Sequence, residues 1–201
     1  MNYVEYNGGV VSPSKVVCIG RNFVEHIKEL DNEVPKEMVI FNKPNSSISR
    51  DLYFVSEDNH YEAELSFLVE GDEICAVGFG LDLTKRELQA KLKEKGLPWE
   101  RAKAFDKSAV FGKFVKFDDM ESLGIELYIN GVLVQKGGVD LMINKPKQIL
   151  KEIKTFMTLE DFDIIMSGTP KGVGKYLKGD KFIGKILQKD KIILEETWIA
   201  K

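Results

Sequence analysis

The feature that most restricts how this chain can fold is a series of short β-type runs separated by turn residues. The runs are rich in Val, Ile, Phe and Tyr and are bounded by Gly, Pro, Asn or Asp, which is typical of strands joined by turns. Asn130-Gly131 stands inside one such region and is the strongest short signal for a hairpin. The predicted strands cover residues 16–19, 38–41, 52–55, 61–69, 74–81, 162–166, 182–187 and 191–198, with a hairpin across 125–134.

Helical signals are few. Asn22 followed by Glu25, and Thr84 followed by Glu87, have the form of capping boxes that begin helices. Pro146 suits the first turn of a third helix. The predicted helices span residues 23–30, 85–95 and 149–156. We therefore predict a mostly β fold with few helices, of the α+β class and without alternating βαβ units.

Composition favours one globular domain over residues 1–201, with 43% hydrophobic and 30% charged residues. The formal net charge of −3 gives no electrostatic reason to expect nucleic-acid or membrane binding, so small molecules are the expected partners. The start of the chain does not resemble a signal peptide, and no apolar run approaches the roughly 20 residues of a membrane span, which predicts a cytoplasmic location. Cys18 and Cys75 lie far apart in apolar runs, which favours free thiols over a disulfide or a metal site.

Two carboxylates stand in the strand-like stretch YEAELSFLV. Glu62 and Glu64 are two residues apart, so a strand directs both to one face, and Asp82 ends the next apolar run, where a neighbouring strand could place it beside them. One interpretation is coincidence, with one glutamate exposed at an edge. The other is a cation site, because carboxylates about 4 Å apart repel by about 4 kcal/mol at an effective dielectric of 20. Ligands that are all oxygen favour Mg²⁺ or Mn²⁺ over zinc.

A histidine and an acid are spaced three residues apart in the first predicted helix. His26 and Glu29 would lie on one face, where the carboxylate can hold the imidazole in one tautomer and make its free nitrogen a better base. A solvated surface pair has the same spacing, so the pattern alone leaves both interpretations open.

The glycine-rich stretch GTPKGVGK, residues 168–175, does not match a nucleotide-binding loop. Its glycines are four and then two residues apart, and Tyr176 follows the lysine where the P-loop needs Ser or Thr. The last glycine of the dinucleotide fingerprint is replaced by Leu177. The backbone amides of such a loop could still bind a carboxylate, and a plain tight turn fits equally well.

In this order, the segments IGRNFVEHIKEL, FNKPNSS, HYEAELSFLV, GLDLTKRELQAKLKEKGLPWERAKAFDKS, ELYINGVLVQ and IIMSGTPKGVG resemble the fumarylacetoacetate hydrolase family. The similarity is to its small single-domain acylpyruvase and oxaloacetate decarboxylase-like members. It extends from about residue 16 to residue 174 and lacks the N-terminal extension of the two-domain hydrolases. The E-x-E pair followed by L-D-x-T-x-R-x-x-Q and G-L-P-W is a specific combination.

The resemblance implies a rolled β-sheet fold, a homodimer, and Mg²⁺ or Mn²⁺ on Glu62, Glu64 and Asp82. It also implies that His26 and Glu29 form a dyad on a segment that orders over the bound ligand. The other positions that match residues of the family's substrate pocket are Arg21, Lys43, Gln89, Lys103 and Thr169.

The leading hypothesis is hydrolytic C–C cleavage of an acylpyruvate, a 2,4-dioxo acid, to pyruvate and a carboxylic acid. The 2-oxo and carboxylate oxygens would be chelated by the metal, His26 oriented by Glu29 would take a proton from the attacking water, and Lys103 would stabilise the enolate. The alternatives on the same site are oxaloacetate decarboxylation, keto–enol tautomerisation, and an isomerase or decarboxylase reaction of a ring-cleavage pathway. A non-catalytic 2-oxo-acid binding protein would not need the dyad.

Overall fold

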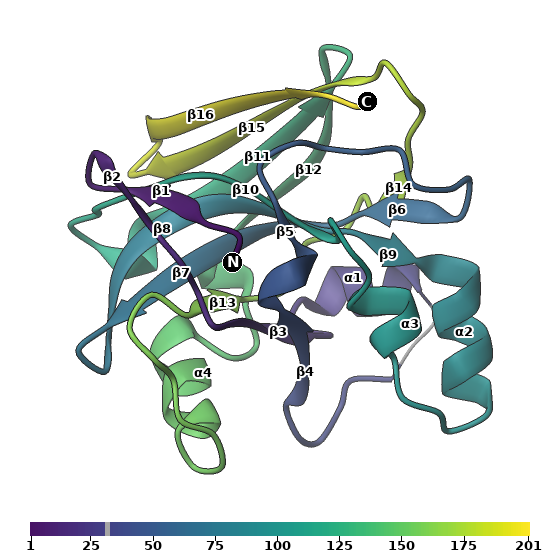
Figure 1. Ribbon diagram of the computed structural model, residues 1–201, viewed down its shortest axis with the longest axis horizontal. Helices are drawn as coiled ribbons and strands as arrows, with labels where there is room; N and C mark the ends of the chain where they lie inside the picture. The colour runs from purple at the N-terminus through teal and green to yellow at the C-terminus, as the bar shows by residue number, and fades with distance from the viewer. Residues whose placement is uncertain (31–32) are drawn as a thin grey trace.

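A curled sheet forms the centre of the protein, for which a computed structural model describes residues 1–30 and 33–201. The sheet runs across the middle of the molecule in Figure 1, and the chain belongs to the mostly β class that the sequence predicts. Within the described residues its strands, in spatial order, are β2 (Gly9–Val11), β1 (Val4–Tyr6), β10 (Ala109–Val115), β8 (Glu73–Asp82), β7 (Ala63–Glu70), β13 (Ile164–Met166), β3 (Lys15–Gly20) and β4 (Val39–Pro44), with β5 (Ile48–Ser49) paired to β10.

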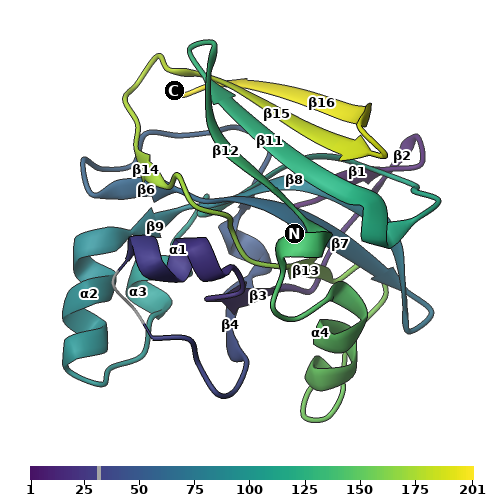
Figure 2. The same cartoon turned by 180° about the vertical axis from the view of Figure 1, so that it is seen from behind.

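A second sheet covers one face of the first, and the main core lies between them (Figures 1 and 2). The Phe79 ring packs against Trp198 with centroids 5.7 Å apart. Gly184 leaves the space that Phe79 fills, because a Cβ there would lie 2.6 Å from the ring. The four strands, in spatial order, are β12 (Val132–Gly138), β11 (Leu123–Ile129), β15 (Lys181–Gln188) and β16 (Lys191–Ile199).

The hairpin expected at Asn130-Gly131 joins β11 to β12. Both residues have positive φ, 50° and 83°, as a two-residue turn of this kind requires. The prediction is therefore confirmed, with strands somewhat longer than the sequence indicated.

A small sheet and three short helices gather at one end of the molecule, where the polar site lies (Figure 2). The small sheet orders β14 (Gly174–Lys175), β6 (Asn59–Tyr61) and β9 (Thr84–Lys85). The helices are α1 (Val24–Glu29), α2 (Arg86–Glu94) and α3 (Glu100–Lys103). The remaining short elements are α4 (Pro146–Ile153) and the 3₁₀ turns η1 (Asn45–Ser47), η2 (Met120–Ser122) and η3 (Val139–Leu141).

Two strand predictions differ from the structure. The predicted strand over residues 61–69 is broken at Glu62, which lies between β6 and β7. Residues 52–55 form no strand, although Phe54 donates to the Lys201 carbonyl and the Lys201 amide donates to the Leu52 carbonyl. Conversely β10, for which the sequence analysis made no prediction, lies inside the large sheet between β1 and β8.

Neither predicted capping box forms. The Asn22 side chain donates to the carbonyls of Asn144 at 2.9 Å and Ser167 at 2.8 Å, so it joins two loops and does not cap α1. The Thr84 hydroxyl donates to a backbone carbonyl. The start of α2 is capped by Asp58, whose carboxylate accepts from the amides of Glu87 and Leu88 at 2.7 and 3.3 Å. Helix α4 ends at residue 153, three residues earlier than predicted.

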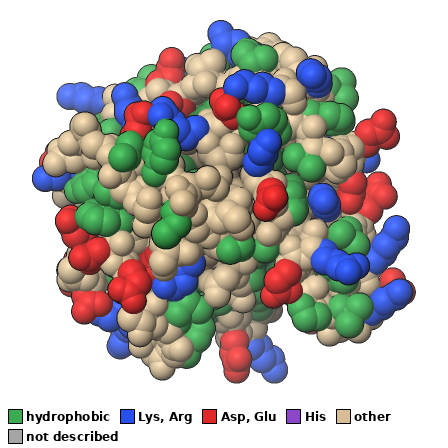
Figure 3. Space-filling model, viewed as in Figure 1, with side chains coloured by type: hydrophobic (Ala, Val, Ile, Leu, Met, Phe, Trp, Pro, Cys, Tyr) green, Lys and Arg blue, Asp and Glu red, His purple; other side chains and the backbone are tan. Residues whose placement is uncertain are grey.

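Side chains of both charges are interspersed over the face shown in Figure 3, in keeping with the small net charge. Within the described residues, no helix is long and apolar enough to span a bilayer. Cys18 is buried and Cys75 half-buried, and both are free thiols, as the sequence suggested.

Candidate active site

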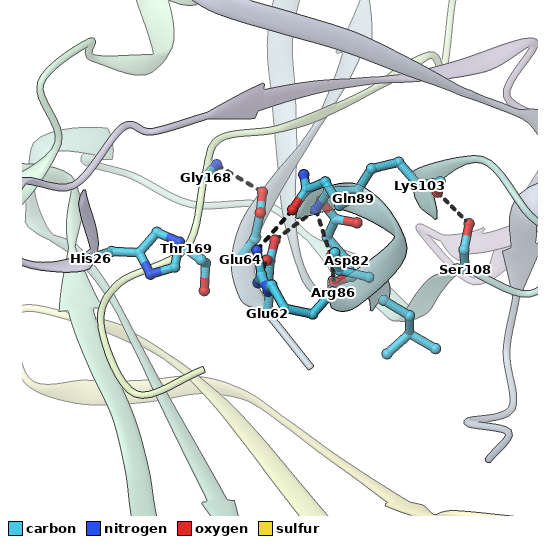
Figure 4. A network of polar contacts seen from close by, with 12 residues as sticks. His26, Glu62, Glu64, Asp82, Arg86, Gln89, Lys103, Ser108, Gly168 and Thr169 are labelled. Atoms are coloured by element: carbon cyan, nitrogen blue, oxygen red, sulfur yellow. Dashed lines mark hydrogen bonds and ion pairs between the residues drawn. The ribbon is translucent and has the colours of Figure 1, made fainter. Parts of the chain in front are cut away.

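The three acids that the sequence singled out meet in the structure. Strands β7 and β8 form an antiparallel pair, and the Asp82 amide donates to the Glu62 carbonyl at 2.8 Å, which fixes the two chain segments side by side. One carboxylate oxygen from each of Glu62, Glu64 and Asp82 lies within 4.8 Å of the others. All three side chains are buried (Figure 4). The interpretation of one glutamate as an exposed edge residue is therefore wrong, and the cation site stays a prediction.

Basic side chains surround the three carboxylates. The Lys103 ammonium, carried on α3, lies 2.8 Å from Glu62 Oε2 and 2.7 Å from Asp82 Oδ2. Arg86, in the first turn of α2, pairs with Glu62 Oε1. The Lys43 ammonium lies 2.8 Å from Asp82 Oδ1. The cluster thus holds three acids against three bases, and little of it is exposed to solvent.

These neighbours move the pKa values of the two glutamates in opposite directions. Burial raises the pKa of Glu62, but the attraction of Lys103 and Arg86 outweighs burial and holds this pKa well below its usual range. Burial raises the pKa of Glu64 well above its usual range, and repulsion from Asp82 and Glu62 adds to the rise. Burial lowers the pKa of Lys103, yet Asp82 and Glu62 raise it by more, so its ammonium stays charged.

The triad fits a hard divalent cation. Its donor atoms are all oxygen, as Mg²⁺ and Mn²⁺ prefer. Asp82 Oδ1 is buried and, among the described residues, accepts no hydrogen bond despite its ion pair. The Glu64 carboxylate accepts one hydrogen bond, from the Gly168 amide at 2.7 Å. Among the described residues Glu64 forms no ion pair, so its negative charge is what a bound cation would neutralise, and Glu62, Glu64 and Asp82 are the residues that could hold the cation.

The predicted histidine–glutamate pair is formed. His26 Nδ1 lies 3.1 Å from Glu29 Oε2, and the imidazole is buried. Glu29 Oε1 also accepts from the Gly172 amide at 2.9 Å, so the carboxylate joins helix α1 to the glycine-rich loop. The contact confirms the spacing argument, while the catalytic role of the pair stays a prediction.

The amides of the glycine-rich loop bind carboxylates, and the carboxylates are the protein's own. Gly168 donates to Glu64 and Gly172 donates to Glu29. Both glycines have φ near +100°, a conformation that other residues rarely adopt. The loop therefore connects the carboxylate triad to the His26–Glu29 pair.

A cavity of about 40 Å³ lies in front of the triad. Thr169 lines it, and its hydroxyl donates to the Ala63 carbonyl at 2.9 Å. Gln89 lines it and accepts from Arg86 at 2.9 Å. The predicted site residues on the cavity wall are Arg21, His26, Glu62, Glu64, Asp82, Gln89, Lys103 and Thr169.

Lys43 is not on the cavity wall. Its ammonium is fully buried behind Asp82, where it donates to the carbonyl of Ser108 at 3.1 Å and to the Ser108 hydroxyl at 3.0 Å. It also donates to the carbonyls of Lys103 and Leu83. The structure thus surrounds the Lys43 ammonium with protein oxygens, and a direct contact with substrate stays a prediction.

The family model for the fumarylacetoacetate (FAA) hydrolase C-terminal domain matches residues 15–195 of the chain. This chain belongs to the fumarylacetoacetate hydrolase family.

Relatives within the family agree with the fold. The chain is 36% identical to the mitochondrial oxaloacetate tautomerase oaa1 of Schizosaccharomyces pombe, over 86% of this chain and 88% of that protein. It superposes on a fumarylacetoacetate isomerase/hydrolase-like protein from Oleispira antarctica with a TM-score of 0.92 and 31% identity, over 100% of both chains. It also superposes on fumarylpyruvate hydrolase from Pseudomonas aeruginosa, solved with Mn²⁺ and pyruvate, with a TM-score of 0.87 and 26% identity, over 99% and 95% of the two chains.

The sequence analysis missed several residues of this family site. Arg86 stands inside the quoted motif LDLTKRELQ, three residues before Gln89, and the shared helix face could have identified it. Phe41 and Trp99 also line the cavity, with ring centroids 5.8 Å apart. They come from different parts of the chain, and no local pattern in the sequence indicates that they meet.

Proposed function

We propose that the protein catalyses keto–enol tautomerisation of oxaloacetate, with Mg²⁺ or Mn²⁺ held by Glu62, Glu64 and Asp82. The observation that carries this proposal is the buried carboxylate triad with a lysine ammonium in contact with two of its members. The name of the fission-yeast relative supports the choice of oxaloacetate over an acylpyruvate as substrate.

Tautomerisation moves one proton between C3 of oxaloacetate and the oxygen on C2, and it consumes neither water nor an oxidant. A divalent cation bound at the triad would polarise the 2-oxo group and make the C3 protons more acidic. The Lys103 ammonium supplies a fixed positive charge that stabilises the negative charge developing on the enolate oxygen. His26, with Nδ1 directed at Glu29, offers Nε2 as the base that takes the proton from C3 and delivers it to the oxygen on C2; in the enol-to-keto direction it carries the proton back.

Binding of the dianionic substrate would rest on the wall of the cavity. Arg21 and Arg86 add positive charge there, and Gln89 is held by Arg86 in a fixed orientation. Thr169 can reach a substrate carboxylate only in competition with the Ala63 carbonyl, because its hydroxyl proton is already donated there.

A second candidate is hydrolysis of an acylpyruvate. The contact between His26 and Glu29 favours it, since a histidine held by a carboxylate is suited to activating water. Decarboxylation of oxaloacetate is a third reaction that needs only enolate stabilisation. The three reactions differ in their products, so an assay can separate them.

The test is a comparison of oxaloacetate, acetylpyruvate and fumarylpyruvate as substrates with added Mg²⁺ or Mn²⁺. We expect faster interconversion of the enol and keto forms of oxaloacetate, followed by ultraviolet absorbance, without matching CO₂ release. Chelation and the variant Glu62→Gln should both remove the acceleration. If oxaloacetate interconverts at the uncatalysed rate while acetylpyruvate yields pyruvate, hydrolysis replaces tautomerisation as the function.

The assembly and location of the protein stay predictions. The family resemblance implies a homodimer in which each subunit is one catalytic domain, residues 1–201. Sedimentation of the purified chain would test the dimer. The sequence favours a cytoplasmic location, whereas the name of the fission-yeast relative places that protein in mitochondria. Fractionation of cells that express the full chain would distinguish the two.

A further inference from the structure

Gln135 is a buried amide that connects the second sheet to the active site. It lies on β12 and its side chain is almost fully buried. Its Oε1 accepts from the Ala63 amide at 2.9 Å, and its Nε2 donates to Thr169 Oγ1 at 2.9 Å and to the Pro170 carbonyl at 2.8 Å. Both hydrogens of the amide and one oxygen lone pair are therefore used, all on groups next to the carboxylate triad.

The contacts of Gln135 close a ring. The Thr169 hydroxyl, which accepts from Gln135, donates in turn to the Ala63 carbonyl at 2.9 Å. Ala63 is thus held at its amide by Gln135 and at its carbonyl by Thr169. The ring also fixes the orientation of the Gln135 amide, because the Ala63 N–H requires an acceptor and the Pro170 carbonyl requires a donor.

Ala63 is the residue between Glu62 and Glu64. The two peptide units that the ring holds set the directions in which the flanking side chains leave the backbone. A shift of Ala63 would therefore change the separation of the two glutamate carboxylates, and it would carry Thr169 with it.

Two glycines allow the loop to approach β12 closely enough for this ring. A Cβ on Gly137 would lie 2.9 Å from the Pro170 side chain, and one on Gly172 would lie 2.0 Å from the Val134 carbonyl. Val134 and Gly137, which flank Gln135 in β12, therefore lie close against the loop, and the ring is one part of a close interface.

We propose that Gln135 is a positioning residue that sets the spacing of the metal carboxylates Glu62 and Glu64 and the orientation of Thr169. The proposal rests on the cation site of the proposed function. Partners that hold metal ligands in place without touching the metal typically change metal affinity by about 10–100-fold when they are removed. Gln135 has this relation to two of the three acids.

The experiment measures Mn²⁺ dissociation constants by calorimetry on the full chain. Gln135→Met keeps the length of the side chain and removes its hydrogen bonds, and it should weaken Mn²⁺ binding by about tenfold. Thr169→Val opens the ring at another point and should give a similar loss, which Thr169→Ser restores. In the double variant Gln135→Met with Thr169→Val, the loss should stay close to that of either single change, because both remove the same ring.

Asp163→Asn is the matched control, since it removes a buried carboxylate at the other end of β7 and β13. It should lower the melting temperature and leave Mn²⁺ affinity unchanged. The proposal is overturned if Gln135→Met binds Mn²⁺ as the natural chain does, or if the two single losses multiply in the double variant. If Gln135→Met does not fold, equal affinities of Thr169→Val and Thr169→Ser overturn it.

Mn²⁺ affinity is independent of which oxo acid is turned over. A natural chain that binds Mn²⁺ but leaves oxaloacetate unchanged would contradict the proposed reaction and leave the role of Gln135 open to the same measurement. A natural chain that binds no Mn²⁺ would overturn both. In the active enzyme, saturating Mn²⁺ should recover more of kcat than of KM in Gln135→Met, because Thr169 stays displaced.

Discussion

A single buried carboxylate, Asp163, and the buried carboxylate triad lie at two places on the large sheet and differ in the hydrogen bonds that they accept. Asp163 accepts hydrogen bonds from the Ser14 amide and hydroxyl, the Lys15 amide and the Glu160 amide, at 2.7–3.1 Å, and its other contact is the Lys15 ammonium at 2.5 Å. Glu64, in the triad, accepts one backbone hydrogen bond and faces two other acids.

The pKa values follow this difference. Burial alone would raise the pKa of Asp163, but its hydrogen bonds with Lys15 and Ser14 outweigh burial and lower it. The pKa of Glu64 is raised. Asp163 is surrounded by donors that hold the chain together, whereas Glu64 has few donors and is available to a ligand. The number of donors, more than burial, separates Asp163 from Glu64.

The largest difference that we expect between Asp163 and the triad is in the stability of their variants, measured without metal. Asp163→Asn should lower the free energy of unfolding by about 3–5 kcal/mol, because it leaves buried donors and the Lys15 ammonium without their anion. Glu64→Gln removes a charge that its neighbours repel, so it should change the same free energy by less than about 1 kcal/mol. Urea unfolding in chelator measures both. Equal losses would show that Asp163 and the triad do not differ as described.

In metal binding the triad variant, and not the Asp163 variant, should show the larger defect. Asp82→Asn should weaken Mn²⁺ binding by more than about 100-fold, since it removes a direct ligand where the loss of an outer partner costs 10–100-fold. Asp163→Asn should bind Mn²⁺ normally. Calorimetry on both variants tests this, and normal Mn²⁺ affinity in Asp82→Asn would exclude it from the site.

One substitution within the site should lower turnover without changing metal affinity. Glu29→Gln keeps an acceptor for the Gly172 amide but weakens the hold on His26, and should lower kcat by about 100-fold. Its Mn²⁺ affinity should stay that of the natural chain, because Glu29 is not a ligand. Unchanged turnover would remove the dyad from the mechanism.

The smallest effect is the dependence on pH. Protons compete with the cation at Glu64, whose pKa is raised, so Mn²⁺ affinity should fall by up to about tenfold per pH unit as the pH drops through that raised value. The contribution of Asp163 to stability is complete above its unfolded pKa, near 3.8, and is lost only as the pH falls through its lower folded value. Calorimetry and urea unfolding across pH 4–7 compare the two. A Mn²⁺ affinity independent of pH would contradict the assignment of Glu64 as a ligand.

The sequence predicted most where the pattern was local. The strands that carry Glu64 and Asp82 are apolar over most of their length, and that pattern predicted both strands. The sequence left open whether the acids meet, since a cation site and an incidental pair both fitted the spacing. The hairpin at Asn130-Gly131 was equally local, because the turn itself demands those residues.

The rest depended on contacts between distant segments. Gly112 lies inside β10, where the Glu196 side chain occupies the space that its Cβ would take, 2.3 Å away. An interior glycine weakens the appearance of a strand in the sequence. The sequence predicted that the Asn22 side chain caps the helix that follows it. In the structure this side chain instead donates to carbonyls of residues 144 and 167, which are distant in the sequence. The family pattern places Lys43 in the substrate pocket, but in the structure it lies behind Asp82. A sequence pattern does not show how deeply a side chain is buried.

The cap that Asp58 supplies to α2 has a consequence for the order of folding. A nine-residue helix is too short to persist alone in water, so Arg86 and Gln89 have no fixed direction until residue 58 is in place. Residue 58 in turn precedes the small strand that leads into Glu62. We therefore expect the amides of Glu87 and Leu88 to become protected only when β6 pairs with β9, which pulsed hydrogen exchange during refolding can follow. A nascent chain would then acquire its substrate-binding helix and its first metal ligand in a single event, and partly folded molecules would present neither to the metal ions and oxo acids around them.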